Sequence, residues 1–208
     1  MSAQSIILAS ASPRRAQLLR DARIPFQVVV SPAAEPERKP AGIPVDLWPM
    51  CLAYLKAAAV QEHLRRASHK IKNQKSKIKN PVILAADTIV VDDTPPMRIL
   101  NKARDRAHAR RMLASLHGKV HRVITGIALV NGDRVRLVSA QAACRIHFPT
   151  KAALEKYLDS GLWKGKAGAY GIQDRHDPFV TLLSGEFSTV VGLPMRLVQS
   201  ELASFQED

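Results

Sequence analysis

Short apolar runs alternate with segments of helical spacing in the first half of the chain. Apolar runs at residues 6–9, 26–30 and 82–92 predict β-strands, and the last of these is the most apolar window of the sequence. Between the runs, apolar residues recur at helical spacing after Pro13 and after Asp46, which predicts two helices. Strands that alternate with helices in this way are typical of an α/β domain.

The second half of the chain adds two helices and a hairpin. Asp105 and Thr150 stand where each could cap a helix that follows it. The dipeptide Asn131-Gly132 separates two β-rich runs, residues 120–130 and 135–148, and is a strong hairpin signal. We therefore expect a mixed sheet flanked by helices.

The C-terminal segment predicts two short strands and a last helix. The strands are expected at residues 179–183 and 188–191, and the helix after Pro194. The chain contains no internal repeat and no convincing linker. We therefore expect a single domain over residues 1–208, with a basic insertion at about residues 65–80.

Length and composition narrow the class of protein. A chain of 208 residues is long enough to bury a full core. No apolar run approaches the ~18 residues of a membrane span, and the N-terminus lacks a signal-peptide pattern. Cys51 and Cys144 are isolated, which argues against a disulfide framework or a zinc site. These features predict a cytoplasmic protein that does not bind membranes.

The net charge of +13 favours acidic partners such as nucleotides or nucleic acid. Residues 65–80 contain no carboxylate. This basic segment could be a solvated loop between a helix and a strand, or a nucleic-acid contact. No aromatic residue is interleaved with its lysines, so we favour the loop.

A candidate anion site lies in the first loop and at the start of the first helix. Ser12 suits the N-cap, and Pro13 suits the first helical position because its missing N–H would be unpaired there anyway. Arg14 and Arg15 then fall in the first turn, where acidic residues are usual. A bound anion of several charges would explain them, since arginine pairs well with phosphate oxygens. The alternative is a solvated basic turn.

Asp87 is the second candidate, because it interrupts the most apolar strand. A lone carboxylate in a buried strand is costly unless it meets a cation or hydrogen-bond donors. We expect Asp87 to be a metal ligand or general base at the end of a central strand, where α/β sheets place their ligands. The alternative is a turn or cap residue.

Six blocks carry a family resemblance that covers essentially the whole chain. They are LASASPRRAQLL at residues 8–19, LKA at 55–57, AADTIV at 85–90, the segment from Gly118 through His121 to Thr125-Gly126, KAGAYGIQ at 166–173 and VVGLP at 190–194. In these blocks the sequence resembles the Maf proteins, a family of nucleoside triphosphate pyrophosphatases also named for septum formation. The first and fifth blocks are long and specific.

The resemblance implies an elongated mixed sheet flanked by helices, similar to that of the inosine triphosphatases, and a homodimer. It also implies hydrolysis of the α–β bond of a nucleoside triphosphate with a divalent metal, Mg²⁺ or Mn²⁺. This activity would belong to the hydrolases acting on acid anhydrides. Its role would be house-cleaning of nucleotides or a control linked to cell division.

Matched block by block, the resemblance makes Asp87 the proton acceptor. Arg14, Thr88 and Gln173 match positions tied to substrate choice. The branch acting on dTTP and UTP carries threonine after the aspartate, as here, and the branch acting on 7-methyl-GTP carries glutamine. The pyrimidine branch is therefore favoured.

Four further residues match the remaining polar pocket of the family: Arg15, Glu35, Lys56 and Lys102. We expect Arg14, Arg15, Lys56 and Lys102 to hold the phosphates. Glu35 and Asp87 would bind the metal through oxygen ligands. Thr88 and Gln173 would read the base edge by hydrogen bonds.

Simpler interpretations exist for several of these residues. Lys56 could be a solvated helix residue, Glu35 an ordinary loop charge close to Glu37, and Gln173 a filler of a glycine-rich turn. The sequence also departs from the family pattern: Gln17 replaces a glutamate, Ala103 a proline and Asp174 a glycine.

Two functional alternatives remain at this point. One is a non-catalytic protein that binds nucleic acid or regulates septum formation through its basic surface. The other keeps the same chemistry but acts on 7-methyl-GTP or another modified base.

Overall fold

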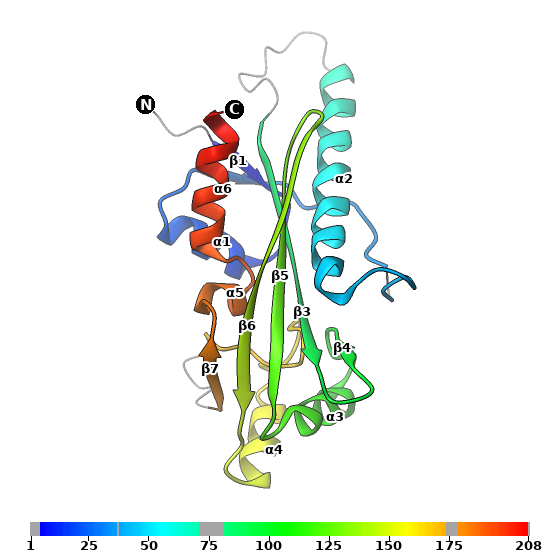
Figure 1. Ribbon diagram of the computed structural model, residues 1–208, viewed down its shortest axis with the longest axis vertical. Helices are drawn as coiled ribbons and strands as arrows, with labels where there is room; N and C mark the ends of the chain where they lie inside the picture. Colours follow the sequence, from blue (N-terminus) through cyan, green and yellow to red (C-terminus); the bar gives the residue numbers. More distant parts are fainter. Residues whose placement is uncertain (1–4, 37, 71–80, 174–178, 208) are drawn as a thin grey trace. The chain divides into compact units, whose positions relative to one another are not determined.

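The computed structural model describes residues 5–36, 38–70, 81–173 and 179–207. Within them the chain forms helices and a seven-stranded mixed sheet, so the predicted α/β class is confirmed (Figure 1). In chain order the elements are β1 (Ile6–Leu8), α1 (Pro13–Asp21), β2 (Phe26–Val28), the 3₁₀ turn η1 (Val45–Leu47), α2 (Trp48–Lys70), β3 (Ile83–Asp92), β4 (Arg98–Leu100), α3 (Arg106–Leu116), β5 (Val120–Asn131), β6 (Arg134–Ile146), α4 (Lys151–Asp159), β7 (Val180–Ser184), α5 (Phe187–Val191) and α6 (Met195–Glu207).

The sheet has the strand order β2-β1-β3-β5-β6-β7, and β4 pairs with β3 outside this path. β1 pairs in parallel with β2 and with β3, whereas the β3–β4 and β6–β7 pairs are antiparallel. Parallel neighbours need a crossover connection. Here α1 connects β1 to β2, and α2 lies in the connection from β2 to β3. The mixed sheet is thus as predicted.

The chain divides into two compact units, which we describe separately. The first unit draws on residues 1–87, 126–139 and 195–208, and the second unit on residues 88–125 and 140–194. The prediction of a single domain stays a prediction.

In the first unit α2 packs closely on the strands (Figure 1). Ala53 and Ala57 of α2 lie in one buried cluster with residues of β1, β3 and β5. Gly126 of β5 allows the start of α2 to come very near, because a Cβ there would lie 2.3 Å from the backbone nitrogen of Met50. This close packing fixes the position of α2 and therefore of the side chains it carries.

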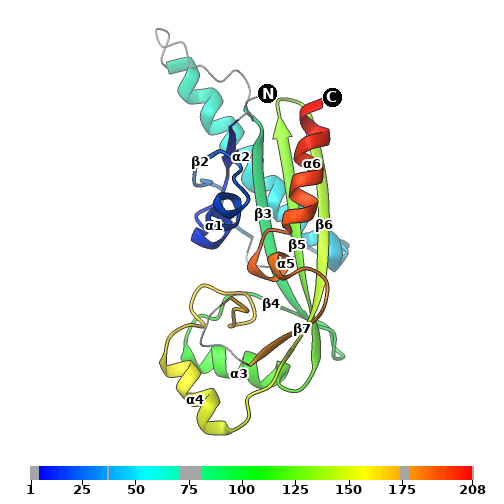
Figure 2. The same cartoon turned by 90° about the vertical axis from the view of Figure 1, so that its left-hand side faces the viewer.

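In the second unit α3 and α4 lie next to each other (Figure 2). The Arg106 guanidinium joins them through Glu155 at 2.8 Å and Asp159 at 2.6 Å. Leu113, Leu116 and other buried residues of α3 share an apolar cluster with α4 and the ends of β3, β5 and β6.

Three predicted helix caps are confirmed. Ser12 accepts a hydrogen bond from the backbone N–H of Arg15, Asp105 from that of His108, and Thr150 from that of Ala153. The hairpin is also confirmed, since β5 and β6 are joined through Gly132, which has φ +62°. Such a left-handed backbone conformation is the one that Asn-Gly turns favour.

Three expectations about elements are wrong. Asp46 does not cap α2 but lies inside η1, because the amide of Leu47 bonds to the carbonyl of Pro44 before the helix begins. The segment expected to be a strand at residues 188–191 belongs to α5. Asp87 is the fifth of ten residues in β3, so it does not end the strand.

The basic segment begins as helix rather than loop, since α2 runs to Lys70. Glu62 stabilises this part of α2 by pairing with Arg65 and Arg66 at 2.7 Å and 2.6 Å. The rest of the basic segment, residues 71–80, lies outside the described residues. Among the helices described, none is long and apolar enough to cross a membrane.

Candidate active site

Lys56 of α2 joins two acidic residues in the first unit. Its Nζ lies 2.9 Å from Oε1 of Glu35 and forms a second ion pair with Oδ1 of Asp87. Lys56 and Asp87 are each only 9% exposed, whereas Glu35 is exposed. Lys56 is therefore not a solvated helix residue, and Glu35 is not an isolated loop charge.

Asp87 lies where β1 stops covering β3. The last paired residues of these two strands are Leu8 and Leu84, and Asp87 follows three residues later. At the same level the chain leaves β1 and enters the loop that leads to α1. Asp87 thus lies just past the carboxyl end of β1, the kind of position at which α/β sheets bind ligands.

Arg15 belongs to the same cluster. Its Nη1 donates a hydrogen bond to Oγ of Ser10 at 3.3 Å, and that oxygen also accepts from the backbone N–H of Ser12 at 3.2 Å. Burial lowers the pKa of the Arg15 guanidinium, Asp87 and Glu35 raise it, and Arg14 lowers it further.

Arg14 adds a second guanidinium beside the first. Burial lowers the pKa of Arg14 as well. Two adjacent guanidinium groups repel each other, and an anion that bound both would relieve the repulsion. Because Arg15 interacts with both Arg14 and Asp87, the predicted anion site and Asp87 come together. We call Arg14, Arg15, Glu35, Lys56 and Asp87 the acid–base cluster.

The acid–base cluster has the chemistry of a site for a hard metal ion. Glu35 and Asp87 already share one cation, the ammonium of Lys56. Carboxylate oxygens suit Mg²⁺ and Mn²⁺, and Mg²⁺ is commonly held by one or two protein carboxylates together with phosphates and water. Within the described ranges no group of three or more His, Cys, Asp or Glu residues is placed to bind a metal. The donor set therefore fits a metal that arrives with a phosphate ligand.

The remaining predicted site residues belong to the second unit. Oγ1 of Thr88 lies 2.9 Å from Oγ1 of Thr125. Lys102 is exposed and forms an isolated antiparallel bridge with Ala167. Gln173 is half-buried and directly precedes residues 174–178, which lie outside the described residues.

Three polar residues of these regions were not among the predicted site residues. Ser10 anchors Arg15, Thr125 bonds to Thr88, and Lys166 is only 7% exposed, with its side chain against Gly171. All three stand in blocks that carry the family resemblance, which was the available signal. Their roles follow from contacts between distant segments, which spacing along the chain does not show.

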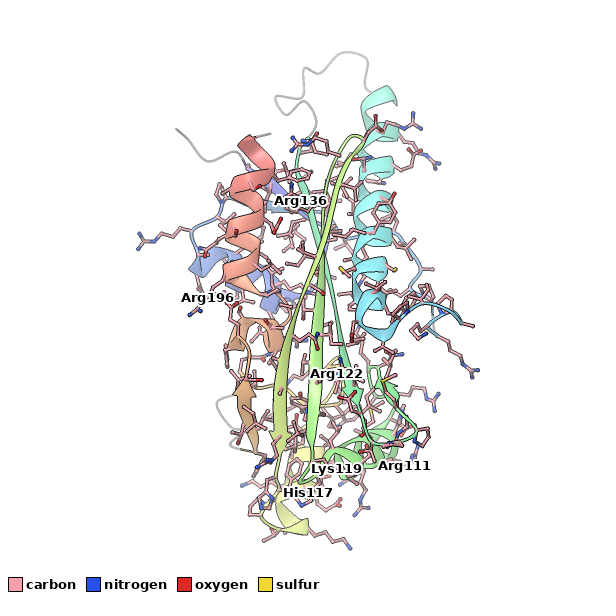
Figure 3. All side chains as sticks on the ribbon, in the orientation of Figure 1. Arg111, His117, Lys119, Arg122, Arg136 and Arg196 are labelled. Carbon is pink, nitrogen blue, oxygen red and sulfur yellow. The ribbon has the colours of Figure 1, made fainter. Side chains whose placement is uncertain are left out.

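Part of the basic charge is used in surface ion pairs. Arg122 in the second unit lies 2.8 Å from Asp93, and Arg136 in the first unit lies 3.1 Å from Glu201 (Figure 3). Exposed pairs of this kind contribute little to stability. They do, however, reduce the positive charge that these two arginines would offer to a nucleic acid.

Comparison with known proteins decides the family. The family model described as Maf-like protein matches residues 5–205. The chain belongs to the Maf family. The resemblance seen in the six blocks is thereby confirmed.

Curated relatives resemble the chain over nearly its full length. The dTTP/UTP pyrophosphatase of Symbiobacterium thermophilum is 38% identical over 202 residues, which cover 97% of this chain and 94% of the relative. The dTTP/UTP pyrophosphatase of Bacillus mycoides is 37% identical over 205 residues, covering 99% of this chain and 97% of the relative. The dTTP/UTP pyrophosphatase of Bacillus cytotoxicus is 37% identical over 202 residues, with 97% and 96% covered.

Proposed function

We propose that this chain hydrolyses dTTP and UTP at the α–β bond and releases the monophosphate and pyrophosphate. The observation that carries the proposal is the acid–base cluster, in which the buried pair of Lys56 and Asp87 adjoins Arg15 and Glu35. The names of the relatives support the same reaction and the same substrates. Such a reaction would serve house-cleaning of the nucleotide pool or the control of cell division.

Charge supports a triphosphate as the ligand of the cluster. Three cationic side chains, Arg14, Arg15 and Lys56, stand against the two carboxylates of Glu35 and Asp87. A triphosphate brings about four negative charges, so its binding needs more positive charge than these side chains supply. A divalent cation held by the two carboxylates would make up most of the difference, and Lys102 is predicted to add to it.

Asp87 is proposed as the group that accepts the proton of the attacking water. Its ion pair with Lys56 holds the carboxylate in place, and an ionised carboxylate has lone pairs to receive a proton. Arg14 and Arg15 would orient the phosphates and stabilise the charge that develops on them as pyrophosphate leaves. Mg²⁺ or Mn²⁺, when bound, would supply further positive charge at the phosphates.

Base recognition is assigned to Thr88 and Gln173 on the family resemblance. Hydrogen-bonding groups discriminate strongly, because a wrong base leaves them unpaired. A homodimer is proposed on the same resemblance. A cytoplasmic location is proposed from the composition, chiefly the isolated cysteines.

The test is a panel of dTTP, UTP, CTP and 7-methyl-GTP, assayed for pyrophosphate with Mg²⁺, with Mn²⁺ and with a chelator. We expect the highest kcat/KM for dTTP and UTP, and no turnover with the chelator. Turnover of 7-methyl-GTP alone would move the chain to the other substrate class. If no triphosphate yields pyrophosphate and the protein binds DNA or RNA with a steep salt dependence, the non-catalytic alternative is correct.

A further inference from the structure

A chain of hydrogen bonds links three segments of the second unit. Oγ1 of Thr88 in β3 lies 2.9 Å from Oγ1 of Thr125 in β5. The Thr125 hydroxyl in turn donates to the backbone carbonyl of Thr189 in α5 at 2.8 Å. Thr125 and Thr189 are fully buried, whereas Thr88 is the one residue of the ten in β3 that is not buried.

The direction of these hydrogen bonds follows from the atoms involved. A carbonyl oxygen only accepts, so the single hydroxyl proton of Thr125 is committed to Thr189. The bond between the two threonine hydroxyls therefore has Thr88 as its donor. The Thr88 hydroxyl can then meet any further group only as an acceptor.

The end of α5 keeps this direction fixed. The amide of Leu193, which would reach the Thr189 carbonyl in a longer helix, bonds to Ser188 instead. If Thr125 turned its proton elsewhere, a buried carbonyl would lose that partner, which is costly. The β-branched side chain of threonine is also restricted in χ1.

We infer that Thr125 is a positioning residue for base recognition, because it leaves the Thr88 hydroxyl only an acceptor for the base. This inference rests on the proposed function, in which Thr88 contacts the base. An acceptor favours a base that presents an N–H group, as uracil and thymine do with their imide N3–H. Cytosine has an acceptor at the same ring position and is disfavoured.

The variant Thr125→Val tests the inference, with the ratio of kcat/KM for UTP to that for CTP as the readout. Valine has the shape of threonine but no hydroxyl, so Thr88 would be able to turn its proton toward the base. We expect the ratio to fall by roughly two- to tenfold, the range of one neutral hydrogen bond. Thr125→Ser keeps the hydroxyl and should retain most of the preference.

Two controls separate positioning from a merely structural effect. Thr189→Val removes a hydroxyl from the same buried cluster but keeps the backbone carbonyl, so the ratio should not change. In a Thr88→Val background, Thr125→Val should have no further effect on the ratio, since Thr125 acts only through Thr88. An additive effect there would overturn the inference.

Wild-type protein allows a second measurement that needs no variant. 3-Methyl-UTP lacks the N3–H and should be a poor substrate, whereas 5-methyl-UTP keeps it and should react like UTP. Equal rates for both analogues, or an unchanged ratio in Thr125→Val, would overturn the inference while leaving pyrophosphate release intact. Absence of pyrophosphate from every triphosphate would instead overturn the proposed function and, with it, this inference.

Discussion

At the scale of single residues, the central feature of the acid–base cluster is the buried ion pair of Lys56 and Asp87. An ion pair that is this buried is expensive to form from two solvated charges, and it often contributes less to stability than apolar residues of the same size would. Its presence beside Arg15 and Glu35 is better explained by chemistry than by folding. Function and stability should therefore respond differently to changes in the pair.

Lys56→Met removes the ammonium and leaves the carboxylate of Asp87 buried with less compensation. We expect the free energy of unfolding to fall by about 3 kcal/mol and pyrophosphate release to fall by at least about a hundredfold. The double variant Lys56→Met/Asp87→Leu should regain most of the stability and none of the activity. Urea unfolding measures the change in the free energy of unfolding. The matched control is Lys156→Met, because Lys156 is an exposed lysine of α4. Full stability in Lys56→Met would contradict the importance of the pair.

His121 makes a prediction about pH. It is buried in the second unit, with Nε2 2.7 Å from the Tyr170 hydroxyl, and burial lowers its pKa from 6.5 to about 4. Between these values the unfolded chain binds more protons than the folded one, so stability falls as the pH drops from 6.5 to 4. The loss should amount to about 3 kcal/mol.

The variant His121→Phe lacks this titration, so the difference in unfolding free energy between wild type and variant should change across that interval. Urea unfolding at several pH values between 4 and 7 measures the difference. Carboxylates titrate in both proteins and cancel in the comparison. A difference that stays constant with pH would show that the pKa of His121 is the same in the folded and the unfolded chain.

At the scale of elements, local signals predicted the boundaries that depend on local contacts. The caps at Ser12, Asp105 and Thr150 were predicted because each side chain bonds to a backbone N–H three residues away. Residues 188–191 were wrongly predicted as a strand, since their valines and threonine favour β structure. There a tertiary contact, the bond from Thr125 to the Thr189 carbonyl, supports a short helix that propensity alone does not indicate.

Gly126 gives a prediction for the packing of α2 on β5. A Cβ at this position would lie 2.3 Å from the backbone nitrogen of Met50 and 2.4 Å from the carbonyl carbon of Pro49. Backbone atoms cannot move aside as a flexible side chain can, so Gly126→Ala should destabilise the protein by about 3 kcal/mol or more.

The control for this variant is Gly132→Asn, at the hairpin turn. Gly132 has open space around it and φ +62°, a conformation that asparagine tolerates, so stability should change by less than about 1 kcal/mol. Thermal unfolding of both variants measures the effects. Equal melting temperatures would mean that α2 does not approach β5 as closely as described.

At the scale of the whole molecule, the sequence predicted the class of fold and the family. The family resemblance also assigned the arginines of the first loop and Asp87 to one phosphate and metal site, and in the structure Arg15 and Asp87 lie close enough to interact. Asp87 was nevertheless placed at the end of its strand. Only the pairing of β1 with β3 shows that β1 ends while β3 continues.

The partners of each charge were not predictable from the sequence. Nothing in the spacing indicates that Lys56 reaches both Glu35 and Asp87, since these three residues come from a loop, a helix and a strand. The hydrogen bonds of Thr125 to Thr88 and Thr189 were likewise not predictable, because they also join segments that are far apart in the sequence. The family resemblance identified the residues, and the structure supplied the contacts from which their roles are argued.

The most direct test follows UTP hydrolysis in H₂¹⁸O, with UMP and pyrophosphate both analysed, for wild type and for Asp87→Asn. Attack of water on the α-phosphorus predicts equal amounts of UMP and pyrophosphate, with the label in UMP. Asp87→Asn should still fold and should release pyrophosphate at least about a thousandfold more slowly, because it lacks the proton acceptor. Formation of UDP and phosphate, or appreciable pyrophosphate release by Asp87→Asn, would contradict the proposed reaction and the role of Asp87.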